Sequence, residues 1–368
     1  MRCVRTHIGK PMHMCCYADT SLFRIAKSWY DRPMFTPLKR VAQALVAPNK
    51  GILAADESTH TMNKRLASIG VSETSESGRQ FREILFTTPG IEQYVSGIIL
   101  FDETIRQATY DGVPFSRLLE NKGILPGIKV DRGLEPLPNF PDEQVSTGLD
   151  GLGTRLDEYY ELGARFTKWR SVIRIGKDLP TNTALRANAF VLARYAATVQ
   201  EHHMVPMVEP EVLFDGDHTL AQSHDVLLAT LAIVFEELVA HHVDLAGVIL
   251  KTSMALPGKD SGMPLDPLEV ARATVHALRE AVPTTVAGIV FLSGGQTPVQ
   301  ATENLYAIAA LGKQPWPITF SYSRALEEPV LSAWMGADRN IPEAQEVFAK
   351  RLKLNVAARN ATYRKDME

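Results

Sequence analysis

Short apolar runs recur along the chain from Gly51 onward, and each is followed by a longer stretch of helical character. The runs are five or six residues long, lack strict alternation, and mostly end at a polar or charged residue. Runs of this kind are typical of parallel strands that are buried on both faces. The eight predicted strands are Gly51–Asp56, Gly97–Phe101, Gly127–Asp131, Phe166–Arg170, Val205–Glu209, Gly247–Lys251, Gly288–Leu292 and Ile318–Tyr322.

Eight strand–helix units predict an α/β fold, a (β/α)8 TIM barrel, formed as a single domain by residues 36–368. A doubly wound open sheet is the alternative, but it would normally show a glycine-rich turn after its first strand. Here Asp56-Glu-Ser-Thr59 follows that strand, and the proline-rich segment Asp131–Thr147 is interpreted as a loop. The crossovers between parallel strands are supplied by helical stretches such as Ala184–Glu201, Asp225–His241 and Leu268–Ala281.

The first 35 residues differ in character from this repeating region. They are basic, poor in acidic residues, and contain no continuous apolar stretch like that of a secretory signal. We interpret residues 1–35 as a poorly ordered extension or the product of an upstream start codon, and an organelle-targeting role stays open. All three cysteines, Cys3, Cys15 and Cys16, lie there, so we expect no disulfide or thiolate metal site in the barrel and a reducing, cytoplasmic setting.

Composition and charge limit the kinds of partner that the protein is expected to bind. The chain of 368 residues is 45% hydrophobic, enough for a sizeable core, and its formal net charge is −3. A charge so near neutral gives no drive toward nucleic acid or anionic membranes. No apolar run approaches the ~20 residues that a membrane-spanning helix needs. We therefore expect a small-molecule partner, no nucleic acid and no membrane.

Polar side chains gather where the predicted strands end. In a barrel of this kind, that face holds the active site, and several strands contribute to it. Lys251 follows the apolar run Gly247–Leu250, where a lysine is poorly solvated and its neutral amine is favoured. A neutral amine can attack a ketone and form an imine, which is an electron sink for carbon–carbon cleavage. The alternative is a structural lysine whose ammonium reaches the surface.

Two pairs of charged residues repeat at a spacing of two. Lys168 and Arg170 share one face of a strand, as do Glu209 and Glu211, because side chains alternate along a strand. The cations need an anionic partner, either a phosphate or nearby carboxylates such as Asp56. The paired carboxylates suit general acid–base chemistry. A buried ion-pair network with no ligand is the alternative for both pairs.

The loops after the seventh and eighth strands carry the features of a phosphate site. Ser293-Gly294-Gly295 follows one strand and Arg324 follows the other. Loops at these positions often bind phosphate in this fold, with glycine admitting the anion to backbone N–H groups. We expect no metal site: His202-His203 and His241-His242 are interpreted as helix ends, since adjacent helical residues do not share a face. Asp215-Gly-Asp-His218 is interpreted as a turn, not a calcium loop.

These residues resemble class I fructose-bisphosphate aldolases, most closely the bacterial members, from about Val46 to about Tyr363. The resemblance covers all eight predicted strands in order. It is carried by Gly51-Ile-Leu-Ala-Ala-Asp-Glu-Ser-Thr59, Gly127-Ile-Lys-Val-Asp131, Lys168-Trp-Arg170, Val208-Glu-Pro-Glu211, Leu250-Lys251, Phe291-Leu-Ser-Gly-Gly-Gln296 and Phe320-Ser-Tyr322.

The resemblance implies roles for individual residues. Lys251 would be the Schiff-base lysine, with Asp56 and Glu209 as acid–base carboxylates and Lys168 tuning the nucleophile. Asp56 would act on the C4 hydroxyl and Glu209 on carbinolamine dehydration. Ser293, Gly294 and Arg324 would hold one phosphate, and Arg65 with Lys129 would lie toward the other end of the substrate. The implied substrate- and phosphate-binding set is Ser58, Arg65, Lys129, Arg170, Glu211, Ser293, Gly294 and Arg324.

The resemblance further implies a sugar bisphosphate substrate, no metal or other cofactor, a homo-oligomer (a tetramer) and a cytoplasmic location. Three departures stand out: Ser323 occupies a position where many members have glycine and could crowd a phosphate, His60-Thr61 replaces a common Gly-Ser, and we expect no terminal tail tyrosine after Tyr363. The alternatives are a Schiff-base barrel aldolase for a different phosphorylated sugar, a non-catalytic barrel scaffold, and a metal-dependent aldolase.

Overall fold

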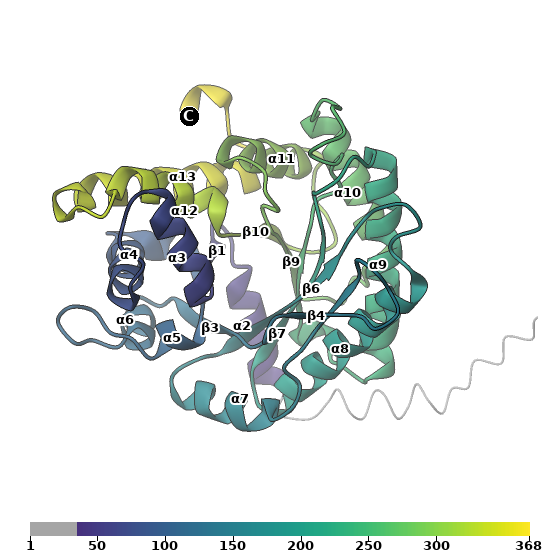
Figure 1. Cartoon of the computed structure of the whole chain (residues 1–368), viewed down its shortest axis with the longest axis horizontal. Helices are drawn as coiled ribbons and strands as arrows, with labels where there is room; N and C mark the ends of the chain where they lie inside the picture. Colours follow the sequence, from purple (N-terminus) through teal and green to yellow (C-terminus); the bar gives the residue numbers. More distant parts are fainter. Residues whose placement is uncertain (1–34) are drawn as a thin grey trace, which may run out of the picture. The chain divides into compact units, whose positions relative to one another are not determined.

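The computed structural model describes residues 35–368, so the prediction for the N-terminal extension and its cysteines lies, apart from Phe35, outside the described residues. Eight parallel strands close into a barrel in the order β1-β10-β9-β8-β7-β6-β3-β2, and helices surround them (Figure 1). This confirms the predicted (β/α)8 fold. The barrel strands are β1 Gly51–Ala55, β2 Val95–Leu100, β3 Leu125–Lys129, β6 Phe166–Ile173, β7 Val205–Val212, β8 Ile249–Thr252, β9 Gly288–Phe291 and β10 Ile318–Tyr322.

The strand boundaries depart from the prediction in two informative places. Strands β6 and β7 continue beyond Arg170 and Glu209, because their register persists to the pair Ile173–Val212. The charged pairs at i and i+2 therefore lie inside regular strands, which fixes the direction of each side chain. Strand β8 begins only at Ile249, since Leu245–Gly247 forms a 3-10 turn.

Helices complete each unit, and the predicted crossovers are confirmed. Helix α9 begins at Leu220, earlier than expected, because Thr219 and Gln222 form a capping box. The helices are α2 Phe35–Leu45, α3 Thr59–Ser68, α4 Ser75–Thr87, α5 Asp102–Ile105, α6 Phe115–Asn121, α7 Leu152–Glu161, α8 Asn182–Glu201, α9 Leu220–Ala240, α10 Pro267–Ala281, α11 Pro298–Ala310, α12 Arg324–Trp334 and α13 Ile341–Arg359, with 3-10 turns at Ile91–Gln93, Leu245–Gly247, Asp338–Asn340 and Lys365–Met367. Within residues 35–368, no helix combines the length and apolar character that crossing a bilayer requires.

The proline-rich segment is more regular than predicted. Strands β4 (Leu134–Pro136) and β5 (Gln144–Ser146) pair antiparallel, so the expectation of an irregular loop was wrong for these residues. Trp169 donates a hydrogen bond from Nε1 to Ser146 Oγ at 2.7 Å and ties this hairpin to β6. Proline disfavours central strands, so its presence led to the prediction of a loop, although an exposed two-stranded ribbon tolerates proline.

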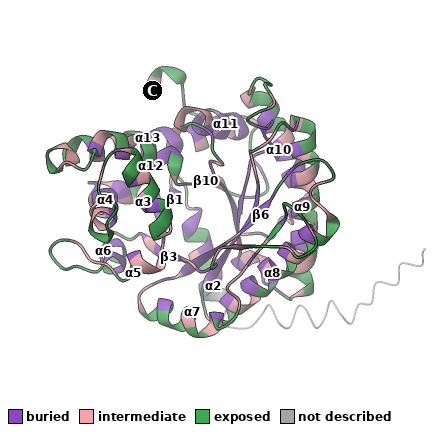
Figure 2. Ribbon diagram, viewed as in Figure 1, coloured by how far each residue is buried: buried purple, intermediate pink, exposed green. Residues whose placement is uncertain are grey.

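An apolar plug closes the end of the barrel opposite the charged residues. Helix α2 contributes Leu38, Ala42 and Leu45, and Val46 follows directly after it, in a buried cluster with inward side chains of the strands, Phe166 among them. Buried residues fill the strands and line the inner faces of the helices (Figure 2). Space inside the barrel is tight here: a Cβ on Gly127 would lie 2.3 Å from the Phe166 ring. Glycine is therefore required at this point of close approach.

We predict that Gly127→Ala lowers the free energy of unfolding by about 1–3 kcal/mol, because the added methyl group overpacks a closed core. In the double variant Gly127→Ala/Phe166→Leu, leucine replaces the ring that the new methyl group would contact. Its loss in unfolding free energy should therefore be smaller than the sum of the losses of the two single variants. Urea unfolding of the four proteins of this cycle measures the coupling. A Gly127→Ala variant that unfolds at the wild-type urea concentration would show that the contact is not restrictive.

Candidate active site

Four charged side chains form a continuous chain at the carboxyl end of the barrel. Lys251 on β8 contacts Glu209 on β7 with an Nζ–Oε1 distance of 3.0 Å. The other oxygen of Glu209 lies 3.1 Å from Lys168 Nζ on β6, and Lys168 lies 2.6 Å from Asp56, which follows β1. Four elements distant in sequence thus bring two amines and two carboxylates together, and all four side chains are buried.

Alternating cations and anions set the protonation of this chain. Burial alone would raise the pKa of Asp56, but Lys168 and Lys251 outweigh it and lower the pKa to about 2. Burial likewise opposes ionisation of Glu209, yet Lys168, Lys251 and Arg170 hold its pKa below the ordinary value. Burial would lower the pKa of Lys168, but Asp56 and Glu209 raise it above the ordinary range. At neutral pH the core of the site is therefore two carboxylates bridged by an ammonium.

Arg170 and Glu211, the second members of the two predicted pairs, lie two residues further along their strands. Arg170 donates from Nε to Glu211. Burial by itself would lower the pKa of the guanidinium, but the Glu211 carboxylate outweighs this effect and raises the pKa. Lys129 contacts Asp131 at 2.7 Å. The structure thus places Glu211 against Arg170, in an ion pair separate from the Lys251–Glu209 contact.

A cavity of about 1100 Å³ opens beside the charged chain. Asp56 and Lys168 form part of its floor, and Lys251 lies behind them, connected through Glu209. Ser58 caps helix α3 by accepting from Thr61 N, which points the first turn of that helix at the cavity. The predicted residues Ser58, Arg65, Lys129 and Arg170 also line it. A sugar bisphosphate needs a polar cavity of this kind with cations near both phosphates.

The two loops predicted to bind phosphate lie together. Gly295 has φ 94°, and a Cβ there would come within 3.8 Å of an Arg324 guanidinium nitrogen. Gly294 also adopts a positive φ, at 58°. Within residues 35–368, the N–H groups of Gly294, Gly295, Ser323 and Arg324 donate no hydrogen bond. Free N–H groups beside a guanidinium, at the start of α12, are suited to an anion.

Two glutamates beside this cavity escaped the sequence interpretation. Glu57 and Glu327 both contact Arg65, and Ser323 bonds to all three residues. The signal was present, because Glu327 lies one helical turn after Ser323 in a stretch whose neighbours Leu326 and Val330 are buried. The Ser323 hydroxyl is turned toward these carboxylates.

The histidine pairs and the Asp215–His218 segment lie at helix ends and in a loop. His202 and His241 are the C-caps of α8 and α9. Asp215–His218 lies in the loop that leads to α9. The described residues contain no group of three or more side chains suited to a metal.

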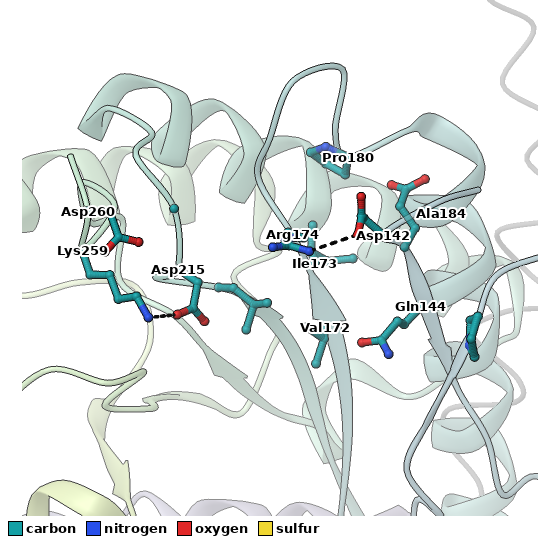
Figure 3. A pocket seen from close by; sticks show the side chains of 14 residues that line it. Asp142, Gln144, Val172, Ile173, Arg174, Pro180, Ala184, Asp215, Lys259 and Asp260 are labelled. Carbon is teal, nitrogen blue, oxygen red and sulfur yellow. Dashed lines mark hydrogen bonds and ion pairs between the residues drawn. The ribbon is translucent and has the colours of Figure 1, made fainter.

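A second cavity, of about 550 Å³, lies beside the β4–β5 hairpin and the ends of β6 and β7 (Figure 3). Its ion pairs, Lys259 with Asp215 and Arg174 with Asp142, join largely exposed side chains. Exposed pairs of this kind are weak and leave each charge hydrated. The charged chain and both predicted phosphate loops lie outside this cavity.

Comparison with known proteins agrees with the geometry. The sequence model of the family described as "Fructose-bisphosphate aldolase class-I" matches residues 37–368. The chain belongs to the class I fructose-bisphosphate aldolase family. This aldolase is thereby confirmed as a lyase of the predicted class, and the predicted barrel is the fold of the family.

Relatives of this aldolase come from several kingdoms. A probable fructose-bisphosphate aldolase class 1 of Xanthomonas campestris pv. campestris is 51% identical over 86% of this chain and 96% of its own length. Fructose-bisphosphate aldolase 4, cytosolic, of Arabidopsis thaliana is 49% identical over 87% of this chain and 82% of its own. A Plasmodium falciparum aldolase, solved with TRAP and a small-molecule inhibitor, superposes with a TM-score of 0.89 at 43% identity, covering 90% of this chain and 96% of that one.

We predict that Asp56 stabilises the fold at pH values above its unfolded pKa of about 3.9 and that this stability is lost as the pH falls toward 2. A shift of nearly two units corresponds to roughly 2–3 kcal/mol. The free energy of unfolding of Asp56→Asn should therefore fall less than that of the wild type between about pH 4 and pH 2. Urea unfolding at each pH measures it, with exposed Asp150→Asn as the control. Equal acid slopes in all three proteins would contradict the lowered pKa.

Proposed function

We propose that this aldolase cleaves fructose 1,6-bisphosphate reversibly into dihydroxyacetone phosphate and glyceraldehyde 3-phosphate, with Lys251 as the nucleophile. The observation that carries the proposal is the Lys251–Glu209–Lys168–Asp56 chain at the barrel mouth. Lys251 is buried at the carboxyl end of β8, with its amine 3.0 Å from a carboxylate. An amine so placed can exchange protons without help from solvent.

Glu209 is assigned to imine formation. The Lys251 amine adds to the substrate ketone, the carbonyl oxygen becomes a hydroxyl group, and loss of water leaves a protonated imine. Both proton movements occur at the nitrogen and oxygen of the former carbonyl. Glu209 contacts Lys251 through one oxygen and Lys168 through the other, so it can deliver and recover those protons.

Asp56 is assigned to the cleavage step. The C3–C4 bond breaks, its electrons enter the imine to form an enamine, and the C4 hydroxyl loses its proton. Asp56 lines the cavity, whereas Glu209 is held between two lysines, so Asp56 is the carboxylate nearer to a substrate hydroxyl group. Lys168, 2.6 Å from Asp56, stabilises the carboxylate before the proton arrives. Protonation and hydrolysis of the enamine then release dihydroxyacetone phosphate.

One phosphate is assigned to the cavity, beside Arg65 and Lys129, and the other to the Ser293–Gly295 loop, which is not among the residues that line it. The Ser293–Gly295 loop with Arg324 would hold the phosphate nearer to Lys251, through free N–H groups and a guanidinium. Arg65 and Lys129, with Ser58 at the start of α3, would hold the other, and Arg170 and Glu211 would bind substrate hydroxyl groups. Two anion-binding groups of residues favour a bisphosphate over other phosphorylated sugars, and the complete charged chain disfavours a non-catalytic scaffold.

The assembly and location of the protein are part of the same proposal. We infer a homo-tetramer, which is supported by the half-exposed apolar residues Phe190 on α8 and Val239 on the adjacent α9. Sedimentation of the protein measures its oligomeric state. A cytoplasmic location is supported by the Arabidopsis thaliana relative named as cytosolic.

Borohydride reduction with dihydroxyacetone phosphate tests the nucleophile. We predict a stable adduct on the peptide that contains Lys251, because only an imine is reduced to a permanent amine link. Lys251→Met should abolish the adduct and lower kcat by several orders of magnitude, as loss of a covalent nucleophile does. An adduct on Lys168 or Lys129 would overturn the assignment, and activity that is lost to EDTA and restored by zinc would indicate the metal-dependent class.

Arg324→Ala tests the phosphate loop. We predict a fall in kcat/KM of roughly ten- to a hundredfold, because a charge-assisted bond to phosphate contributes about 1.5–3 kcal/mol. The melting temperature without ligand should stay near wild type, since Arg324 is exposed. Arg324→Lys should restore only part of the activity, because a point charge replaces a planar fork. Unchanged kcat/KM with a lower melting temperature would assign Arg324 a structural role.

A further inference from the structure

A buried cluster of two glutamates, an arginine and a serine forms one wall of the active-site cavity. Arg65 Nη1 donates to Glu57 at 2.8 Å and to Glu327 at 2.6 Å, and Nη2 donates to Ser323 at 3.0 Å. Ser323 Oγ in turn lies 2.5 Å from Glu57 and 3.1 Å from Glu327. The guanidinium is thus held from three sides, and Arg65, Glu57 and Ser323 all border the cavity.

The protons available to this cluster are too few for two carboxylates. Arg65 Nη1 carries two hydrogens and can serve both glutamates. The Ser323 hydroxyl carries one hydrogen, yet its oxygen lies within bonding distance of both carboxyl groups. The hydroxyl can donate its hydrogen to only one of the two carboxyl groups. Its contact with the other carboxyl group is favourable only if that group carries a proton of its own.

Burial and charge decide which glutamate carries the proton. The Glu327 side chain has no exposed surface, and burial followed by the charge of Glu57 raises its pKa well above the ordinary value. Burial also opposes ionisation of Glu57, but Arg65 and Arg82, the latter 3.6 Å away, outweigh it and lower its pKa. Asp56 and Glu328 are the other charged groups that act on the cluster, through Glu57 and Arg65 respectively. The proton therefore belongs on Glu327.

We propose that Ser323 and a protonated Glu327 are positioning residues, which hold the Arg65 guanidinium toward the phosphate of the aldehyde half of the substrate. This inference rests on the proposed function, because it assigns Arg65 to that phosphate. With Glu327 neutral, Arg65 and Arg82 together face the single carboxylate of Glu57, so the cluster and Arg82 keep one net positive charge between them. Ionisation of Glu327 would cancel that charge and weaken the attraction for phosphate.

The serine has a specific part in this arrangement. A glycine at position 323 would leave Arg65 Nη2 without its partner in the protein, and the guanidinium would be held only through its Nη1 contacts with Glu57 and Glu327. The hydroxyl joins α12 to the residues after β1 and restricts the guanidinium to one orientation. Restricting a flexible cation before the ligand arrives lowers the entropy lost on binding.

Ser323→Ala tests positioning in the direction of condensation. We expect KM for glyceraldehyde 3-phosphate to rise about three- to tenfold, while KM for dihydroxyacetone phosphate and kcat stay within twofold of wild type. Ser332→Ala is the matched control, because Ser332 is an exposed serine of the same helix whose hydroxyl bonds to the Glu328 carbonyl. Equal changes in both KM values, or no change in either, would overturn the positioning role.

Infrared spectroscopy tests the proton. At neutral pH the wild type should show the C=O stretch of a protonated, buried carboxyl group, and Glu327→Gln should remove that band from the difference spectrum. No such band in the wild type, or an undiminished band in Glu327→Gln, would overturn the assignment.

Trapping separates this inference from the proposed function. Borohydride reduction with dihydroxyacetone phosphate should label Lys251 in the wild type and in Ser323→Ala to the same extent. Absence of label in the wild type would count against the proposed function. Normal labelling together with an unchanged KM for glyceraldehyde 3-phosphate would count against the inference alone.

Discussion

The contact of Lys168 with two carboxylates is the interaction on which the rest of the site depends. Its amine lies 2.6 Å from Asp56 and 3.1 Å from Glu209, and all three groups are buried. Without that cation, two carboxylates would be withdrawn from water with too little compensation, at a cost of several kcal/mol. With it, Glu209 stays ionised beside Lys251 and Asp56 stays ionised at the cavity wall. One amine therefore keeps both carboxylates ionised.

The closed barrel makes this concentration of charge tolerable. Its lower layers are apolar and are sealed by α2, so they supply the hydrophobic stabilisation that offsets the polar upper layer. Parallel strands that end on one face also bring residues from β1, β6, β7 and β8 within hydrogen-bonding distance. Rigid strands hold the amines and carboxylates, whereas the proposed phosphate ligands lie on loops and helix starts, where backbone N–H groups are free.

The same principle recurs at the far wall of the cavity. There, Arg65 is shared between Glu57 and Glu327, as Lys168 is shared between Asp56 and Glu209. The two arrangements differ in outcome. Lys168 and Lys251 are near enough to Asp56 and Glu209 to keep both carboxylates ionised. Glu327, by contrast, is so deeply buried and so near Glu57 that these two glutamates are not both charged.

The sequence by itself determined the class of fold and predicted most of the candidate site. Doubly buried strands leave apolar runs that can be counted, and the polar residues at their ends predict which face holds the site, so Lys251, Lys168 and Glu209 could be named as candidates without coordinates. Hidden pairings were decided only by tertiary structure. Glu57 lies eight residues from Arg65 and Glu327 lies 262 residues from it, and the sequence does not show that both glutamates meet this arginine. The β4–β5 hairpin was missed because proline masks short strands. Protonation depends on which charges meet in space, and strand periodicity carries no record of that distance.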